Sequence, residues 1–226
     1  SRFTAQMDNN PAVSGMAHDP KGVPISAIIF GGRRSTTVPL VLQSFNWTHG
    51  VYLGATMGSE TTAAASGTVG VVRRDPMAML PFCGYDMGTY FDHWLQMSAR
   101  IADPPKIFIA NWFRKDDAGA FLWPGYGENM RVLEWIIGRC SGAAGAVETP
   151  VGWAPRPDDL DLAGLDIARE RLATLLRVDP AEWADELGAH AEWFAKLGAT
   201  VPQALELQRQ LLSASVELAA GAPGRA

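Results

Sequence analysis

Short apolar runs separated by glycine, proline and polar residues dominate the first two thirds of the chain. The run "PISAIIFGG" predicts a buried strand over 25–30, closed by two glycines. Further strands are predicted over 51–56 and 69–72, and "KIFIANWF" predicts an interior strand over 106–113, because it is short and rich in β-branched and aromatic residues. Residues 1–24 are rich in Pro, Asn, Asp and Gly, so irregular backbone is expected there.

Helical spacing of apolar residues begins in the middle of the chain. A helix over 90–100 is predicted by the positions of Phe91, Trp94, Leu95 and Ser98. A second helix is predicted to begin at Asn129, with that residue as its N-cap and Gly138 as its stop. Its apolar residues form one helical stripe: Val132, Leu133, Ile136 and Ile137.

The last third, after a small-residue linker over 141–146, is predicted to be helical. Asp179, Pro180 and Glu182 supply an N-cap, a proline at the first helical position and an acid at the third. The buried face of that helix is predicted to hold Trp183, Leu187, His190, Phe194 and Leu197.

The amino-acid composition argues against several classes of function. The formal charge of −5 and the pI near 5.4 disfavour a nucleic-acid surface, including an aromatic single-strand binder, because phosphate neutralisation needs clustered Lys and Arg. The sequence contains no run of about 18 apolar residues, so no membrane span is predicted. Two cysteines, Cys83 and Cys140, without metal spacing or a disulfide framework, are expected to be free thiols in a reducing cytoplasm. The start at Ser1, without Met or signal peptide, indicates a piece of a longer protein.

The densest candidate chemistry is the aromatic turn "FLWPGYGEN" and the strand end before it. A flat base could stack between rings held by a strand end and a Pro-Gly turn, or the rings could simply close a core edge. Asn129 follows the turn and could read a purine edge or only cap its helix. The rings concerned are Trp112, Phe113, Phe121, Trp123 and Tyr126.

Two glycine-containing segments offer further candidates. "GGRR", at 31–34, could present backbone N–H groups and a guanidinium to an anion, although the motif is weak by itself. The small-residue stretch over 58–70 is typical of a mobile lid over a site, or of a flexible surface loop that has no function. The sequence contains no Gly-x-x-x-x-Gly-Lys-Ser/Thr loop, and its histidines are not spaced as metal ligands: His18, His49, His93 and His190.

In this order, the blocks "SRFTA", "GVPISAIIFGGRR", "VPLVLQSFNWTHGVYLGATMGSETTAAA", "RRDPMAMLPFCGYDMGTYFDHWL", "PKIFIANWFRKDDAGAFLWPGYGENMRVLEW" and "DLDLAGLD" resemble the C-terminal portion of GTP-dependent phosphoenolpyruvate carboxykinases, with "VGVVRRDPMAMLPF" most similar to actinobacterial members. The resemblance covers nearly the whole chain. It implies a GTP-binding mixed α/β region with a lid over 1–150 and a helical subregion of the same domain over 151–226.

The family reaction converts oxaloacetate and GTP to phosphoenolpyruvate, CO2 and GDP in gluconeogenesis, assisted by Mn²⁺ and Mg²⁺. Carried over by position, the resemblance implies that Arg2 is catalytic, that Ser1 and Arg2 bind substrate, and that Arg2 and Arg33 contact the nucleotide phosphates. The implied guanine pocket comprises Trp112, Phe113, Phe121, Tyr126, Gly127, Glu128 and Asn129. The implied lid comprises Ser59, Glu60, Thr61, Thr62, Ala63, Ala64, Ala65, Ser66 and Gly67.

This sequence departs from the family pattern at a few positions. Tyr126 stands where Phe is usual, Met130 replaces a common Ser, and "AQMDNNP" differs from the residues that usually follow "SRFT". The family's phosphate loop with its reactive cysteine and its metal ligands lie outside this segment, and neither Cys83 nor Cys140 matches that cysteine. The resemblance therefore implies a cytoplasmic, monomeric enzyme of which this segment alone is inactive; a non-catalytic guanine-nucleotide-binding module is the alternative.

Overall fold

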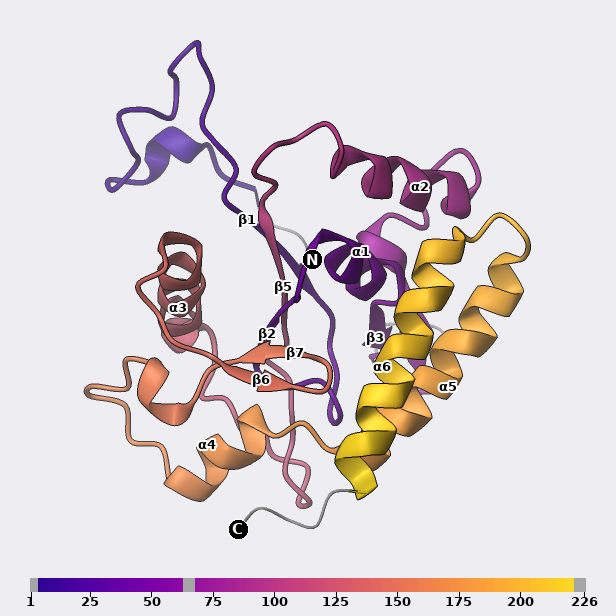
Figure 1. Ribbon diagram of the computed structural model, residues 1–226. Coiled ribbons are helices and arrows are strands. Elements are labelled where there is room, and N and C mark those ends of the chain that lie inside the picture. Colours follow the sequence, from indigo (N-terminus) through magenta and orange to yellow (C-terminus); the bar gives the residue numbers. More distant parts are fainter. Residues whose placement is uncertain (1–3, 63–67, 222–226) are drawn as a thin grey trace.

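The computed structural model describes residues 4–62 and 68–221. A five-stranded sheet lies at its centre, with α1, α5 and α6 on one side and α3 and α4 on the other (Figure 1). The strand order is β1-β5-β2-β7-β6, so the fold is mixed α/β, as predicted. Strands in this sheet are β1 (Ala27–Gly31), β2 (Val41–Gln43), β5 (Lys106–Ala110), β6 (Val147–Thr149) and β7 (Gly152–Ala154).

The helices surround this sheet, and a small hairpin stands beside it. The helices are α1 (Trp47–Ala55), α2 (Met87–Met97), α3 (Asn129–Ser141), α4 (Arg169–Leu176), α5 (Pro180–Leu197) and α6 (Gln203–Gly221). The hairpin pairs β3 (Gly58–Glu60) with β4 (Val72–Arg74). Short 3-10 turns are η1 (Met7–Asn9), η2 (Pro76–Ala78), η3 (Tyr126–Glu128) and η4 (Pro157–Asp159). None of the described helices is long and apolar enough to cross a membrane.

The parallel pairing of β1 with β5 places two loops at the same edge of the sheet. Both strands run in one direction, with Gly31 opposite Ala110, so the segments that follow them emerge together. Ligands of open α/β sheets bind at the carboxyl ends of such strands. β2 is antiparallel to β5, so its start at Val41 also lies at this edge.

Most predicted elements are present, with shifted bounds, but the part after the linker over 141–146, predicted to be helical throughout, begins with the strands β6 and β7. The strands predicted over 25–30 and 106–113 are β1 and β5, the helix over 90–100 is α2, and Asp179 caps α5 by accepting from the amides of Ala181 and Glu182. The strand predicted over 69–72 begins only at Val72. Residues 4–24 contain only the 3-10 turn η1 and extend away from the sheet (Figure 1).

The strand predicted over 51–56 is wrong, because residues 51–55 belong to α1 and Thr56 is its C-cap. Asn46 caps the helix by accepting from the amide of His49, and α1 lies so close to the sheet that it is buried along most of its length. Burial on nearly every side removed the helical periodicity that would have identified it. Two glycines allow this approach: a Cβ on Gly50 would lie 2.5 Å from Ile107, and one on Gly54 would lie 2.7 Å from Phe30.

Gly50→Ala is therefore expected to destabilise the fold by about 1–3 kcal/mol, since an added methyl group would overlap the Ile107 side chain of the sheet. Urea denaturation measures the effect. Gly188→Ala is the matched control, because Gly188 is an exposed helical glycine with open space around it. The same change there only reduces the backbone entropy of the unfolded chain. Equal stability of the two variants would contradict the close packing of α1.

Two predictions about α3 are also wrong. The helix continues through Gly138 to Ser141 and ends at Gly142, whose positive φ of 78° permits the left-handed cap. Asn129 does not act as N-cap, because that position belongs to Glu128, and the Asn129 side chain instead accepts from Trp123 Nε1 at 2.9 Å. The expected division at residue 150 falls in the turn between β6 and β7 and stays a prediction.

Candidate functional site

The "GGRR" segment follows β1 directly and is held by the hairpin. The amide of Arg33 donates to Ser59 Oγ at 3.1 Å, and its carbonyl accepts from the amide of Glu60 at 2.7 Å. The Glu60 carboxylate in turn accepts from both the amide and the hydroxyl of Ser35, at 2.6 and 2.7 Å. The backbone that carries Arg33 is thus fixed by β3, while the Arg33 side chain stays half-buried.

A cavity of about 270 Å³ opens between this segment and the end of β5. Its lining comprises Gly31, Gly32, Arg33, Ser59, Ala110, Trp112 and Phe113. The Arg33 guanidinium lies over the Phe113 ring, with its carbon 4.7 Å from the ring centroid. The walls of this cavity are therefore a cation, two aromatic rings and glycine backbone.

The aromatic turn continues from this cavity. Phe113 and Phe121 meet edge to face, with ring centroids 6.1 Å apart, and Lys115 Nζ lies 5.2 Å from the Phe121 centroid. Phe121 is 49% exposed, so a large part of its ring is open to a ligand. Two aromatic rings and two cations thus share one neighbourhood at the sheet edge.

The backbone of the turn is anchored by helices α3 and α4. Arg171 on α4 donates to the carbonyls of Leu122 and Phe121, both at 2.6 Å. Trp123 is almost fully buried, and its indole nitrogen bonds Asn129. The remaining candidates differ in exposure: Tyr126 is 92% exposed, Gly127 is exposed, and Glu128 is half-buried and bonded to Arg131 at 2.6 Å.

The sequence candidates therefore separate into three groups. Arg33, Trp112 and Phe113 line one cavity, and Phe121 adjoins Phe113. Gly127, Glu128 and Asn129 lie in η3 and the first turn of α3, next in sequence to the exposed Tyr126. Ser59, Glu60, Thr61 and Thr62 form β3 and its continuation, whereas Ser1, Arg2, Ala63, Ala64, Ala65, Ser66 and Gly67 lie outside the described residues.

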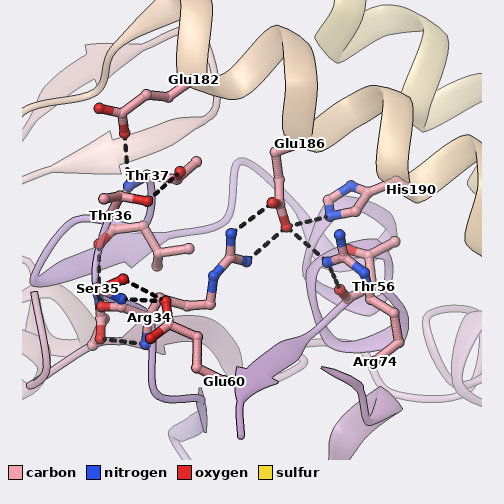
Figure 2. A network of polar contacts seen from close by, with 12 residues as sticks. Arg34, Ser35, Thr36, Thr37, Thr56, Glu60, Arg74, Glu182, Glu186 and His190 are labelled. Atoms are coloured by element: carbon pink, nitrogen blue, oxygen red, sulfur yellow. Dashed lines mark hydrogen bonds and ion pairs between the residues drawn. The ribbon is translucent and has the colours of Figure 1, made fainter. Parts of the chain in front are cut away.

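An ionic network is centred on Glu186 and includes Arg34, the residue after Arg33 (Figure 2). Arg34 donates both terminal nitrogens to Glu186 of α5, at 2.7 and 2.6 Å, and Arg74 of β4 donates to the same carboxylate at 2.7 Å. Arg74 also donates to the carbonyl of Thr56 at 2.9 Å. One carboxylate thus joins helix α5, the arginine segment and the hairpin.

Protonation in this network is set by burial and by the arginines. Burial by itself would raise the pKa of Glu186, but hydrogen bonds from Arg34 and His190 hold that pKa well below its ordinary value. Burial lowers the pKa of His190 to about 4, so this imidazole is neutral at pH 7. A neutral ring can donate from Nε2 to Glu186, at 3.1 Å, and accept at Nδ1 from the Tyr52 hydroxyl, at 2.7 Å.

Sequence reasoning missed Glu186 and Asn111 as members of this site. Glu186 stands four residues before His190 on a face predicted to be buried, and that spacing was a usable signal for a buried pair. Asn111 follows an apolar strand directly, and a polar side chain at such a strand end is the second signal. Neither signal identifies Arg34 as the partner, because Arg34 lies far from both Glu186 and Asn111 in the sequence.

Two further expectations concern cysteines and metals. Cys83 and Cys140 are free thiols, as predicted. Within residues 4–62 and 68–221, no group of three or more His, Cys, Asp or Glu side chains is arranged to hold a metal ion. The resemblance places the ligands of Mn²⁺ and Mg²⁺ outside this segment, and that expectation stays a prediction.

The fold is a mixed α/β sheet, and a cavity lined by a cation and aromatic rings lies at the carboxyl ends of two of its parallel strands. The family model described as the phosphoenolpyruvate carboxykinase C-terminal P-loop domain matches residues 1–215. The chain belongs to the GTP-dependent phosphoenolpyruvate carboxykinase family, as its sequence blocks indicated.

Curated relatives agree with the family model. "Phosphoenolpyruvate carboxykinase [GTP]" of Anaeromyxobacter dehalogenans strain 2CP-C is 65% identical over 97% of this chain and 37% of its own length. The proteins of that name from Paenarthrobacter aurescens and Thermoplasma volcanium are 53% and 51% identical, over 91% and 94% of this chain and 34% and 36% of their own lengths. The chain thus spans little more than a third of these relatives.

Proposed function

We propose that this chain supplies the guanine-nucleotide site of a GTP-dependent phosphoenolpyruvate carboxykinase. The observation that carries the proposal is the cavity of about 270 Å³, whose walls combine the Arg33 cation with Trp112 and Phe113 at the sheet edge. Aromatic faces suit a flat base, and a guanidinium suits a polyphosphate. The name shared by the relatives supplies the specific nucleotide and reaction.

In the proposed reaction, oxaloacetate loses CO2 and leaves an enolate, whose oxygen takes the γ-phosphoryl group of GTP. The products are phosphoenolpyruvate, CO2 and GDP, a step of gluconeogenesis. Phosphoryl transfer needs positioning and fixed positive charge more than covalent chemistry from the protein. Arg33 would hold phosphate oxygens, and Arg2 would contact both substrate and nucleotide phosphate.

The base would stack against Phe113 and Phe121, with Trp112 and Tyr126 as further walls. Gly127, Glu128 and Asn129 would complete the pocket through backbone and side chain. Phe113 already carries the Arg33 guanidinium over its ring, so the base would take the ring surface that the cation leaves open. Residues 59–67 would form the lid, and a family metal, when bound, would supply positive charge at the phosphates.

Phe121→Ala is expected to weaken GTP binding by about 1–3 kcal/mol, because it removes one stacking face. Titration calorimetry on the full-length protein measures the change. Phe82→Ala is the matched control, since Phe82 is also an exposed phenylalanine, 64% accessible, but lies outside the cavity. An unchanged dissociation constant for Phe121→Ala would remove this ring from the base site.

A non-catalytic guanine-nucleotide-binding module is the second candidate, since the cavity beside Arg33 and Phe113 would serve nucleotide binding without catalysis as well. An assay of the full-length protein with oxaloacetate, GTP and Mn²⁺ separates the two. The carboxykinase forms phosphoenolpyruvate, while the module binds GTP and forms none. The genomic sequence upstream of Ser1 provides a second test, since an open frame with a Gly-Lys-Thr loop and metal ligands is expected for the enzyme.

A further inference from the structure

Asn111 is a buried amide whose hydrogen-bonding groups all have partners. It follows β5 directly and is fully buried. Its Oδ1 accepts from the amides of Arg34, at 3.3 Å, and Phe113, at 3.1 Å. Its Nδ2 donates to the carbonyls of Arg34, at 2.9 Å, and Val38, at 2.7 Å. A primary amide has this capacity of two donors and two acceptor positions.

These four bonds join the two segments that line the cavity. One segment follows β1 and carries Arg33, next in sequence to the bonded Arg34. The other follows β5 and carries Phe113, which is itself bonded. Strand pairing at Gly31 and Ala110 holds the inner end of this junction, and the amide of Lys115 bonds the carbonyl of Ser35 at 2.9 Å farther along.

The backbone groups that meet at position 111 explain why an asparagine stands there. Two backbone N–H groups and two carbonyls meet at one buried side chain, so the side chain must accept and donate at the same time. A carboxylate of nearly the same shape would put an acceptor against the carbonyls of Arg34 and Val38. Buried polar groups left without partners are costly, so the junction depends on the amide itself.

We propose that Asn111 is a positioning residue that fixes the spacing between the phosphate-binding Arg33 and the base-stacking Phe113. This inference rests on the proposed function, because it assigns phosphate to one segment and base to the other. A nucleoside triphosphate contacts both segments only when their spacing matches the distance between its base and its phosphates. Asn111 therefore links the two halves of the nucleotide site without touching the ligand.

Hydrogen exchange of the full-length wild-type protein tests this link without a mutation. Guanosine, which has a base but no phosphate, is expected to slow exchange in the peptide containing Arg34. Inorganic tripolyphosphate, which has no base, is expected to slow exchange in the peptide containing Phe113. Protection confined to the Phe113 segment with guanosine and to the Arg34 segment with tripolyphosphate would overturn the proposal.

A variant gives the second test. Asn111→Asp is expected to lower the ratio of the guanosine to the GTP dissociation constant about 10-fold, because base and phosphates no longer bind together, while guanosine binding alone changes little. Val216→Ala, a buried change in α6, controls for a general loss of stability and should leave the ratio unchanged. An unchanged ratio in folded Asn111→Asp would contradict the positioning role.

These outcomes are distinct from failure of the proposed function. If the wild-type protein binds neither guanosine nor GTP, the proposed function is wrong and this inference is lost with it. If the wild-type protein binds both and Asn111→Asp keeps the wild-type ratio, only the positioning role is wrong.

Discussion

Glu186→Ala is expected to destabilise the protein by about 3–5 kcal/mol. Glu186 is 8% exposed and binds both Arg34 and Arg74, so its removal would leave the buried guanidinium of Arg34 and the partly buried guanidinium of Arg74 without their anion. Urea denaturation at pH 7 measures the loss. Glu217→Ala, at an exposed glutamate of α6, is the matched control and should change stability little.

The effect should depend on pH in a defined direction. The folded-state pKa of Glu186 is lowered, so its contribution is present above the unfolded pKa of about 4.3 and is lost as the pH falls through the lower folded value. The gap between wild type and Glu186→Ala should therefore narrow below about pH 4.3. A gap of constant size from pH 7 to pH 3, or a loss below about 1 kcal/mol at pH 7, would contradict the role of Glu186 as the anion of this network.

Arg33→Ala is expected to lower kcat/KM for phosphoenolpyruvate formation by about 10²–10³-fold in the full-length enzyme. Its guanidinium faces the cavity proposed for the nucleotide, and removal of one fixed charge-stabilising donor has effects of this size. Steady-state kinetics with varied GTP measures the change, separately for kcat and KM.

The control for this prediction is Arg73→Ala. The Arg73 side chain is 66% exposed, and within residues 4–62 and 68–221 its one ion pair is with Asp75, so its loss should alter the kinetics by less than about 3-fold. If Arg33→Ala and Arg73→Ala behave alike, Arg33 does not act on the phosphates.

The sequence predicted the edge of the sheet well, because the signals there are local. An apolar run followed by two glycines gave β1 and the arginine segment, and "KIFIANWF" gave β5 with its rings at the end. The N-cap of α5 was also predictable, since Asp179 accepts from the amides two and three residues farther on and Pro180 occupies the first helical position.

The errors arose where tertiary packing overrides local pattern. α1 is buried along most of its length against the sheet, so its residues lack the polar face that marks a helix. Asn129 was a good N-cap by residue type, but Trp123 offered its side chain another partner.

The contacts that organise the candidate site could not be predicted from the sequence, because they join residues that are far apart along the chain. Arg34 and Glu186 are 152 positions apart, and Arg34 and Asn111 are 77 positions apart. Nothing in the chain between them indicates that they meet. The residue types show that a buried arginine, glutamate or asparagine needs a partner, but only the fold shows that Arg34 is paired with Glu186 and Asn111.

The most direct test of the account is a crystal structure of the full-length protein with GDP bound. The account predicts that the guanine ring contacts Phe113 and Phe121 and that a phosphate oxygen lies within hydrogen-bonding distance of the Arg33 guanidinium. A nucleotide bound elsewhere, with the cavity beside Arg33 and Phe113 left free of it, would contradict the account.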